Sequence, residues 1–256
     1  MEDNTDISMQ DGLGGRSEAG PEFQPVVEID AEFLREIGSV DDSSAGMTTA
    51  AVGEKPVDED QIGARFSEGG ISVCAGSLAV VNSLSSRTVA ALVRYLVGQR
   101  RPPAGVVTVL GHDMGRVGRG EILRLRRRIG VVGGDYGLIP DLTVAQNLAL
   151  PCLVRKLGRR QARSRVERIS EALRIAELLE ERVSLLGSIE RRVTLIARAL
   201  AHDPELVILE APLSGLDKQW SAVVVEQFKR LAVTGSAALF FHEYSGAFVA
   251  KSEAEK

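Results

Sequence analysis

The chain has 256 residues, of which 44% are hydrophobic, 26% charged and only 4% aromatic, and its formal net charge is −4. This composition is typical of one globular domain or of a domain with an appendage, and two cysteines, Cys74 and Cys152, exclude a disulfide framework and a cysteine metal cage. The apolar runs fall far short of the roughly 20 residues of a membrane helix, and the acidic start excludes a targeting peptide, so we expect a protein of the cytoplasm without direct membrane insertion.

The first 60 residues carry most of the negative charge. Residues 1–60 contain sixteen acidic and three basic side chains, a net charge of −13, which leaves +9 on the remaining 196 residues. Few aromatics and no sustained periodicity predict an acidic, mostly disordered extension. Within it, apolar residues at helical spacing predict a short amphipathic helix over 26–38, either a transient helix in a linker or a segment that docks to a partner.

The elements predicted from Ile71 onward alternate between short apolar strands and longer helices. Strands are expected at 77–81, 106–110, 128–132, 206–209 and 237–243, and helices at 88–98 and over 142–186, with breaks at Pro151 and near Gly158. Such alternation predicts an α/β fold on a largely parallel sheet flanked by helices. The segment between the third and fourth strands is too long for one crossover, so residues 61–256 form one domain with a helical subdomain at about 135–187.

Three segments carry a family resemblance. They are RRRIGVVGGDYGLIPDLTVAQNLALP at Arg126–Pro151, RRVTLIARALAHDPELVIL at Arg191–Leu209 and SGLD at Ser214–Asp217. In this order and spacing the chain resembles the ATP-binding subunits of ABC transporters, and most of all the FtsE family, over roughly residues 71–250. The resemblance implies a P-loop NTPase-like fold with an inserted ABC-type helical subdomain. ABC subunits normally begin with antiparallel strands that carry an aromatic residue for adenine stacking. Before Ile71, the only candidate segment for these strands is ARFSEGG, and its Phe66 is a poor candidate for the aromatic residue.

The same resemblance indicates that the phosphate loop is degenerate. Where the family has GxxxxGK[ST], this chain reads SLSSRTVAA over Ser83–Ala91. The family glycines fall on Ser83, Ser86 and Thr88, with Ser85 between them, and the lysine falls on Val89, which cannot neutralise a phosphate. Arg87 and the helix N-terminus leave weak ATP or Mg²⁺ binding open.

The other positions of the nucleotide site are altered too. The glutamine that links Mg²⁺ to the membrane partner falls on Gly134, and the signature segment reads LLGSI over Leu185–Ile189, with Gly187 retained. Glu210 keeps a carboxylate near the metal position, whereas Ala211 replaces the general base. Asp217 of the D-loop and the switch histidine, His242, survive. We therefore expect no ATP hydrolysis, no resident cofactor and no metal site.

The segment that opens the helical subdomain still follows the family pattern. In ABC subunits this region receives the coupling helix of the membrane partner, so the resemblance implies docking residues here: Asp135, Tyr136, Leu138, Ile139, Pro140 and Val144. The leading hypothesis is a pseudo-ATPase, peripheral at the inner face of the cell membrane. It would bind a permease resembling FtsX or form a heterodimer with an active ABC ATPase subunit, in cell division or transport.

Two alternatives stay open. One is a soluble scaffold or regulator that works through the acidic extension, and the other is a divergent but active ATPase that uses Arg87 and Glu210. The basic run Arg119–Arg128 is interpreted as the exposed face of a helix rather than a nucleic-acid site, because no aromatic residues accompany it.

Overall fold

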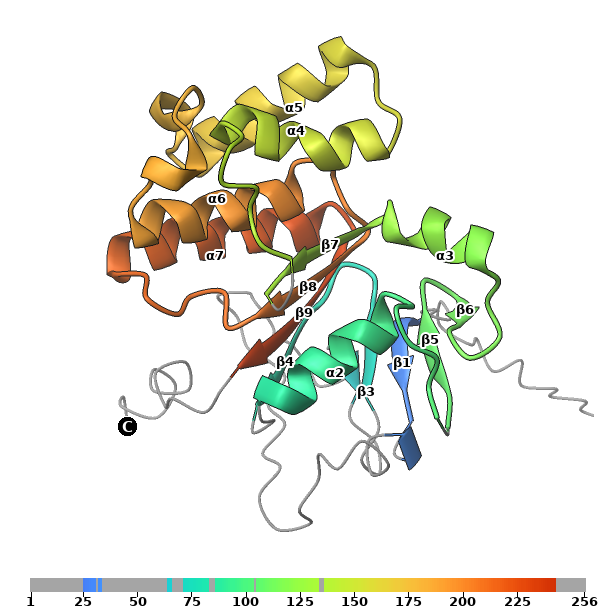
Figure 1. Ribbon diagram of the computed structural model, residues 1–256. Helices are drawn as coiled ribbons and strands as arrows, with labels where there is room; N and C mark the ends of the chain where they lie inside the picture. Colours follow the sequence, from blue (N-terminus) through green and yellow to red (C-terminus); the bar gives the residue numbers. More distant parts are fainter. Residues whose placement is uncertain are drawn as a thin grey trace, which may run out of the picture.

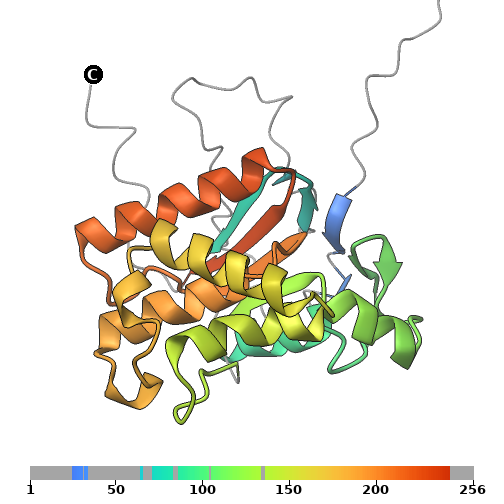
Figure 2. The same cartoon turned by 90° about the horizontal axis from the view of Figure 1, so that it is seen from above.

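The computed structural model describes residues 25–30, 32–33, 64–65, 71–82, 86–103, 105–133 and 136–242. Two sheets organise these residues: a four-stranded parallel sheet and a five-stranded antiparallel sheet (Figure 1). The view from above places the antiparallel strands at one end and most of the helices at the other (Figure 2). The α/β fold with a parallel sheet flanked by helices is therefore confirmed.

The parallel sheet has the strand order β4-β9-β8-β7. Its strands are β4 (Leu78–Asn82), β9 (Ala237–His242), β8 (Leu206–Glu210) and β7 (Ile129–Val132). Residues Leu206–Leu209 of the central strand β8 are completely buried, because both faces of the sheet are covered. Alternate residues pack on α2 (Ser86–Leu96) on one face and on α6 (Ser188–Leu200) and α7 (Lys218–Val233) on the other.

The antiparallel sheet contains a strand from the acidic N-terminal segment. Its order is β2-β3-β1-β5-β6, with β1 (Pro25–Ile29), β2 (Ala64–Arg65), β3 (Ile71–Cys74), β5 (Val107–Val109) and β6 (His112–Asp113). Strand β1 pairs with β3 on one side and with β5 on the other. The antiparallel strands of an ABC subunit are thus present, although only residues 64–65 of ARFSEGG are among them.

The prediction of a helix over 26–38 is wrong for its first residues, because Pro25–Ile29 form strand β1. Val27 and Ile29 are buried whereas Glu28 between them is exposed, a period of two rather than of 3.6 residues. Asp30 then ends the strand by accepting hydrogen bonds from the backbone N–H groups of Phe33 (2.8 Å) and Val106 (2.5 Å). The expected disordered extension over 1–60 therefore contains a strand of the folded body, and residues 34–60 lie outside the described residues.

The helical subdomain contains α4 (Val144–Val154), α5 (Arg159–Ala172) and two short 3-10 helices, Ala176–Leu178 and Val183–Leu185. Gly158 separates α4 from α5 as expected, but Pro151 lies inside α4 and does not break it. Tertiary packing explains this difference, since Leu148 and Cys152 on either side of the proline are completely buried against the subdomain core.

Candidate nucleotide edge and docking groove

The carboxyl ends of the parallel strands meet at one edge of the sheet. Asn82 is in register with His242, Glu210 with Phe241, and Val132 with Leu209. The start of α2, Glu210, Ala211 and His242 therefore come together, as the resemblance predicted. In open α/β sheets, ligands bind at the edge formed by the carboxyl ends of the strands, so this is the candidate nucleotide site.

The start of α2 offers no charge at the lysine position. The helix begins at Ser86, and the side chains of Thr88 and Val89 are only 9% and 2% exposed. Val89 belongs to the apolar core between α2 and the sheets. Ser83 and Ser85 lie outside the described residues, as does the side chain of Arg87. In the part of α2 that is described, the lysine position thus contributes packing rather than phosphate binding.

Glu210 is the acidic group at this edge, and it is closely enclosed. A Cβ atom placed on Gly133, whose φ is +124°, would lie 2.4 Å from Glu210 Cβ and 2.6 Å from Oε2. The Oε2 atom is buried and has no hydrogen-bond partner among the described residues. Such an oxygen suits a cation, but no group of three or more metal-ligating residues occurs in the described ranges. Among the described residues, Glu210 is thus a single carboxylate at this edge. Gly134 lies outside the described residues.

Arg192, on α6, closes the other side of the edge and was not singled out in the sequence. Its guanidinium donates to the backbone carbonyl of Ala211 and, at 3.4 Å each, to those of Glu210 and Pro212. Burial lowers the pKa of Arg192, and the charge of Glu210 partly opposes this effect. Ala211 has φ +42° and presents only a methyl group where a general base would stand. The only sequence feature that could have pointed to Arg192 is its place in the segment RRV, residues 191–193, which belongs to the family resemblance.

Two retained motif residues serve as helix caps. The Asp217 carboxylate caps α7 by accepting a hydrogen bond from the Trp220 N–H at 2.9 Å. Gly187 is the N-cap of α6, and its N–H donates to Glu190 Oε2 at 2.8 Å. Both residues are exposed at the surface. Each of the two residues therefore terminates a helix of the described structure.

A separate groove lies between β7 and α2 on one side and α4 and α6 on the other. It encloses about 540 Å³, and its lining includes Val97, Gln99, Arg126, Tyr136, Ile139, Pro151, Val154, Arg198 and His202. Two of the predicted docking residues, Tyr136 and Ile139, line it. Ile139 is 43% exposed and Val154 59%, so the walls present apolar surface to the solvent. This groove is the candidate docking site for an apolar partner segment.

Residues 136–143, which include the predicted docking residues Tyr136 and Ile139, are held in place by polar side chains of the helical subdomain. The buried Asn147 Oδ1 accepts from the Ile139 N–H at 2.8 Å, and its Nδ2 donates to the carbonyls of Ile139 and Thr143 at 3.0 Å each. Arg198 donates to the carbonyls of Gly137 (2.7 Å) and Tyr136, and burial lowers the pKa of this guanidinium.

Other predicted docking residues do not face the groove. Val144 is completely buried, and Leu138 is partly buried against the core of the helical subdomain, so both side chains pack within the subdomain. Pro140 is exposed but is not part of the groove lining, and Asp135 lies outside the described residues. The predicted docking residues therefore include some that pack in the subdomain and some that are exposed at the surface.

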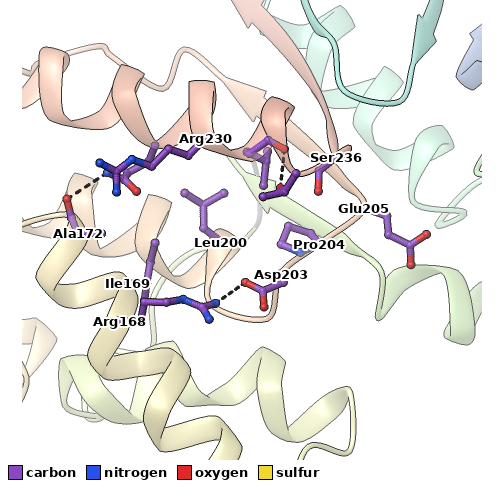
Figure 3. Close-up of a pocket in the computed structure, with 12 residues that line it drawn as sticks. Arg168, Ile169, Ala172, Leu200, Asp203, Pro204, Glu205, Arg230 and Ser236 are labelled. Carbon is purple, nitrogen blue, oxygen red and sulfur yellow. Dashed lines mark hydrogen bonds and ion pairs between the residues drawn. The ribbon is translucent and has the colours of Figure 1, made fainter.

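A second hollow of about 550 Å³ lies at the opposite edge of the parallel sheet, between α5 and α7 (Figure 3). Glu205 and Ser236, which line it, directly precede β8 and β9, so it is remote from the nucleotide edge. Asp203 in its rim is ion-paired with Arg168 at 2.6 Å and with Arg165 at 3.0 Å. Both arginines are thus engaged by one carboxylate, and the hollow lies away from the carboxyl ends of the strands, so it is not the candidate nucleotide site.

The fold is the one found in ABC transporter cassettes. The dimeric structure of a bacterial ABC transporter cassette superimposes with a TM-score of 0.59 at 20% identity, covering 66% of this chain and 75% of that one. The structure of an ATP-binding subunit of an ABC transporter gives a TM-score of 0.58 at 17% identity, covering 67% of this chain and 71% of that one.

Sequence comparison identifies the family. The cell division ATP-binding protein FtsE of Haemophilus influenzae is 32% identical over 165 residues, 62% of this chain and 74% of that protein. FtsE of Escherichia coli K12 is 32% identical over 166 residues, 62% of this chain and 73% of that protein. The profile of the ABC transporter family matches residues 90–214. The chain belongs to the ABC transporter ATP-binding family and is an FtsE-like subunit. None of its described helices is long and apolar enough to span a bilayer.

Proposed function

We propose that this FtsE-like subunit has lost ATP hydrolysis and acts by docking to a membrane subunit resembling FtsX, or to an active ABC ATPase subunit, at the inner face of the cell membrane. The observation that carries the proposal is the burial of Val89 at the lysine position, together with a methyl group at Ala211. The family profile matches from residue 90, next to Val89, and so leaves out most of the segment Ser83–Ala91, which supports the same interpretation.

The magnitudes favour an inactive site. A missing general base lowers a rate by about 10²–10⁴-fold, and a missing electrostatic clamp on the phosphates has an effect of similar size. Such losses are not simply multiplicative, but either one removes most of the catalysis. Glu210 is enclosed by Gly133 and does not replace the lost general base, and Arg192 is bound to backbone carbonyls and does not replace the lost lysine.

Docking is supported by the groove between β7, α4 and α6. Its apolar walls, Ile139 and Val154, are exposed to solvent, while Asn147 and Arg198 hold the backbone of one wall. A chain that retained only its fold would have no need for an exposed apolar groove of about 540 Å³. The groove is therefore the feature that we assign to partner binding.

Calorimetric titration with Mg-ATP tests the loss of nucleotide function. The full chain is expected to show no binding up to millimolar nucleotide and no phosphate release, with Escherichia coli FtsE as the positive control. Micromolar binding that Arg87→Ala abolishes would demonstrate a rebuilt phosphate site and contradict the pseudo-ATPase proposal.

Affinity capture from detergent-solubilised membranes tests docking. The wild-type chain is expected to retain a permease-type subunit or an ABC ATPase, and Ile139→Arg in the groove should abolish this capture. Val233→Arg is the matched control, because Val233 is 88% exposed and is not part of the groove lining. Equal capture by the wild type and Ile139→Arg would refute the assignment of the groove.

A further inference from the structure

The chain from 94 to 128 is strongly basic. It contains nine arginines and two acidic residues, Asp113 and Glu121, and therefore supplies a large part of the positive charge of the folded body. Both acidic side chains already have partners: Glu121 Oε1 lies 2.9 Å from His112 Nε2, and Asp113 Oδ2 lies 3.3 Å from Arg116 Nε. Two carboxylates cannot neutralise nine arginines, so this segment keeps a large excess of positive charge.

Helix α3 (Arg119–Arg126) concentrates this charge on one face. Arg119, Leu123 and Arg127 follow one another at intervals of four residues and so lie on the same side, with Arg124 beside them. The opposite side is packed: Leu125 is 2% exposed, and a methyl group added to Gly98 would lie 3.0 Å from the Ile122 side chain. The four residues Arg119, Leu123, Arg124 and Arg127 are called the α3 face below.

Among the described residues, no side chain pairs with the arginines of the α3 face, and the face also contains an exposed leucine. Within the described ranges, the side chains of Arg119, Arg124 and Arg127 make no ion pair or hydrogen bond, whereas Arg128 is paired with Glu205 at 2.5 Å. Leu123 is 55% exposed between these guanidinium groups. In Figure 1, α3 lies at the periphery, with no helix or strand on its outer side.

An anionic bilayer surface fits both features of the α3 face. Guanidinium groups donate to lipid phosphates, and an exposed leucine among them enters the boundary between headgroups and acyl chains. A nucleic acid would use the arginines but not Leu123, and the face has no aromatic side chain for base stacking. Charge and apolar exposure together therefore favour the membrane.

The position of α3 beside the docking groove also favours a bilayer surface as the binding partner of the α3 face. Arg126, on the same helix, donates to the carbonyls of Val97 (2.7 Å) and Gly98 (3.0 Å) and lines the groove. A membrane subunit held in the groove would bring α3 close to the lipid surface, a step that rests on the proposed function. We propose that the α3 face binds an anionic phospholipid surface and so orients the subunit on the membrane.

Vesicle co-sedimentation of the full chain tests this proposal without any permease. Vesicles of equal parts phosphatidylglycerol and phosphatidylcholine are expected to bind the protein, and vesicles of phosphatidylcholine alone are not. Each arginine near an anionic surface strengthens binding by about fivefold, so the triple variant Arg119→Gln/Arg124→Gln/Arg127→Gln should bind about 100-fold more weakly. Added salt should weaken the wild-type interaction.

Two further variants separate the contributions. Leu123→Ser should weaken binding severalfold without changing the charge. Arg159→Gln/Arg160→Gln/Arg174→Gln removes the same charge from exposed positions around α5 and should leave most of the binding intact. Circular dichroism melting should be unchanged in all variants, since these side chains are on the surface.

Three results would overturn the proposal: no preference for phosphatidylglycerol, equal losses in the two triple variants, or an RNA oligonucleotide bound through the α3 face while vesicles are not. The failure of the groove assignment is distinguishable from these. If the wild-type chain captured no partner but still bound vesicles, the docking proposal would be contradicted and the lipid-binding proposal for the α3 face would remain supported.

Discussion

Asn147 links the docking groove to the interior of the helical subdomain. Its side chain is completely buried, and it bonds both the N–H and the carbonyl of Ile139, one of the groove residues. Asn147→Ala removes these bonds together with the bond to the Thr143 carbonyl. We expect the loop between 139 and 143 to loosen and the subdomain to lose stability.

The size of this loss follows from the three hydrogen bonds. Each intramolecular bond contributes about 1 kcal/mol, and the small cavity left by the amide adds to the loss, so the free energy of unfolding should fall by about 2–4 kcal/mol. For a folded body of this size, each kcal/mol lowers the melting temperature by about 2–4 °C. The substitution should also weaken partner capture, because Ile139 would no longer be held in the groove wall.

Urea unfolding monitored by circular dichroism measures the loss. Gln146→Ala is the matched control on the same helix: the Gln146 side chain accepts from the Thr143 N–H at 2.9 Å at an exposed position, so its removal should lower the free energy of unfolding by about 1 kcal/mol or less. If Asn147→Ala were no more destabilising than Gln146→Ala, the role assigned to the buried amide would be refuted.

Three further predictions concern other parts of the fold. Gly133→Ala should destabilise by about 2 kcal/mol or more because of its φ of +124° and its contact with Glu210, whereas Gly137→Ala, with open space around it, should have little effect in the same urea assay. Leu148→Ala, in the subdomain core, should lower the free energy of unfolding by about 2–5 kcal/mol, and a small effect, as expected for the half-exposed Leu153→Ala, would contradict the packing. Burial, followed by the charge of Arg155, lowers the pKa of His202 from 6.5 to about 4, so only the unfolded chain takes up this proton between these values. Stability should therefore decrease by up to about 3 kcal/mol as the pH falls through that range, and His202→Gln should flatten this slope in unfolding curves measured at successive pH values.

The elements that could be predicted from the sequence are those of the part of the chain where strands and helices alternate. Leu206–Leu209 is apolar throughout and is the central strand β8, and Gly158 marks the start of α5. Strand β1 was mistaken for a helix because Val26, Ile29 and Phe33 also satisfy a helical period. Its partners, β3 and β5, lie far away in the sequence, so only tertiary pairing distinguishes the two interpretations.

The candidate site was predicted less completely than the fold. The motif positions do meet at one sheet edge, because parallel strands end there together. Sequence alone did not separate Val144, which is buried, from Ile139, which is exposed, since both belong to one continuous motif. Nor did it reveal that Arg192 and Arg198 bind backbone carbonyls, because a carbonyl partner leaves no trace in the amino-acid pattern.

The central place of β1 in the antiparallel sheet changes what the acidic segment is. The chain leaves the sheet after Ile29 and returns to it at Ala64 and Ile71, so the residues between are an insertion anchored at both ends rather than a free tail. Truncation at residue 60 would remove a strand with two neighbours and separate β3 from β5 in the antiparallel sheet. An internal excision bridged by a short flexible linker would remove most of that acidic charge while keeping β1, and the entropy of loop closure changes only slowly with loop length. The insertion can therefore vary in length and charge independently of the cassette that carries it.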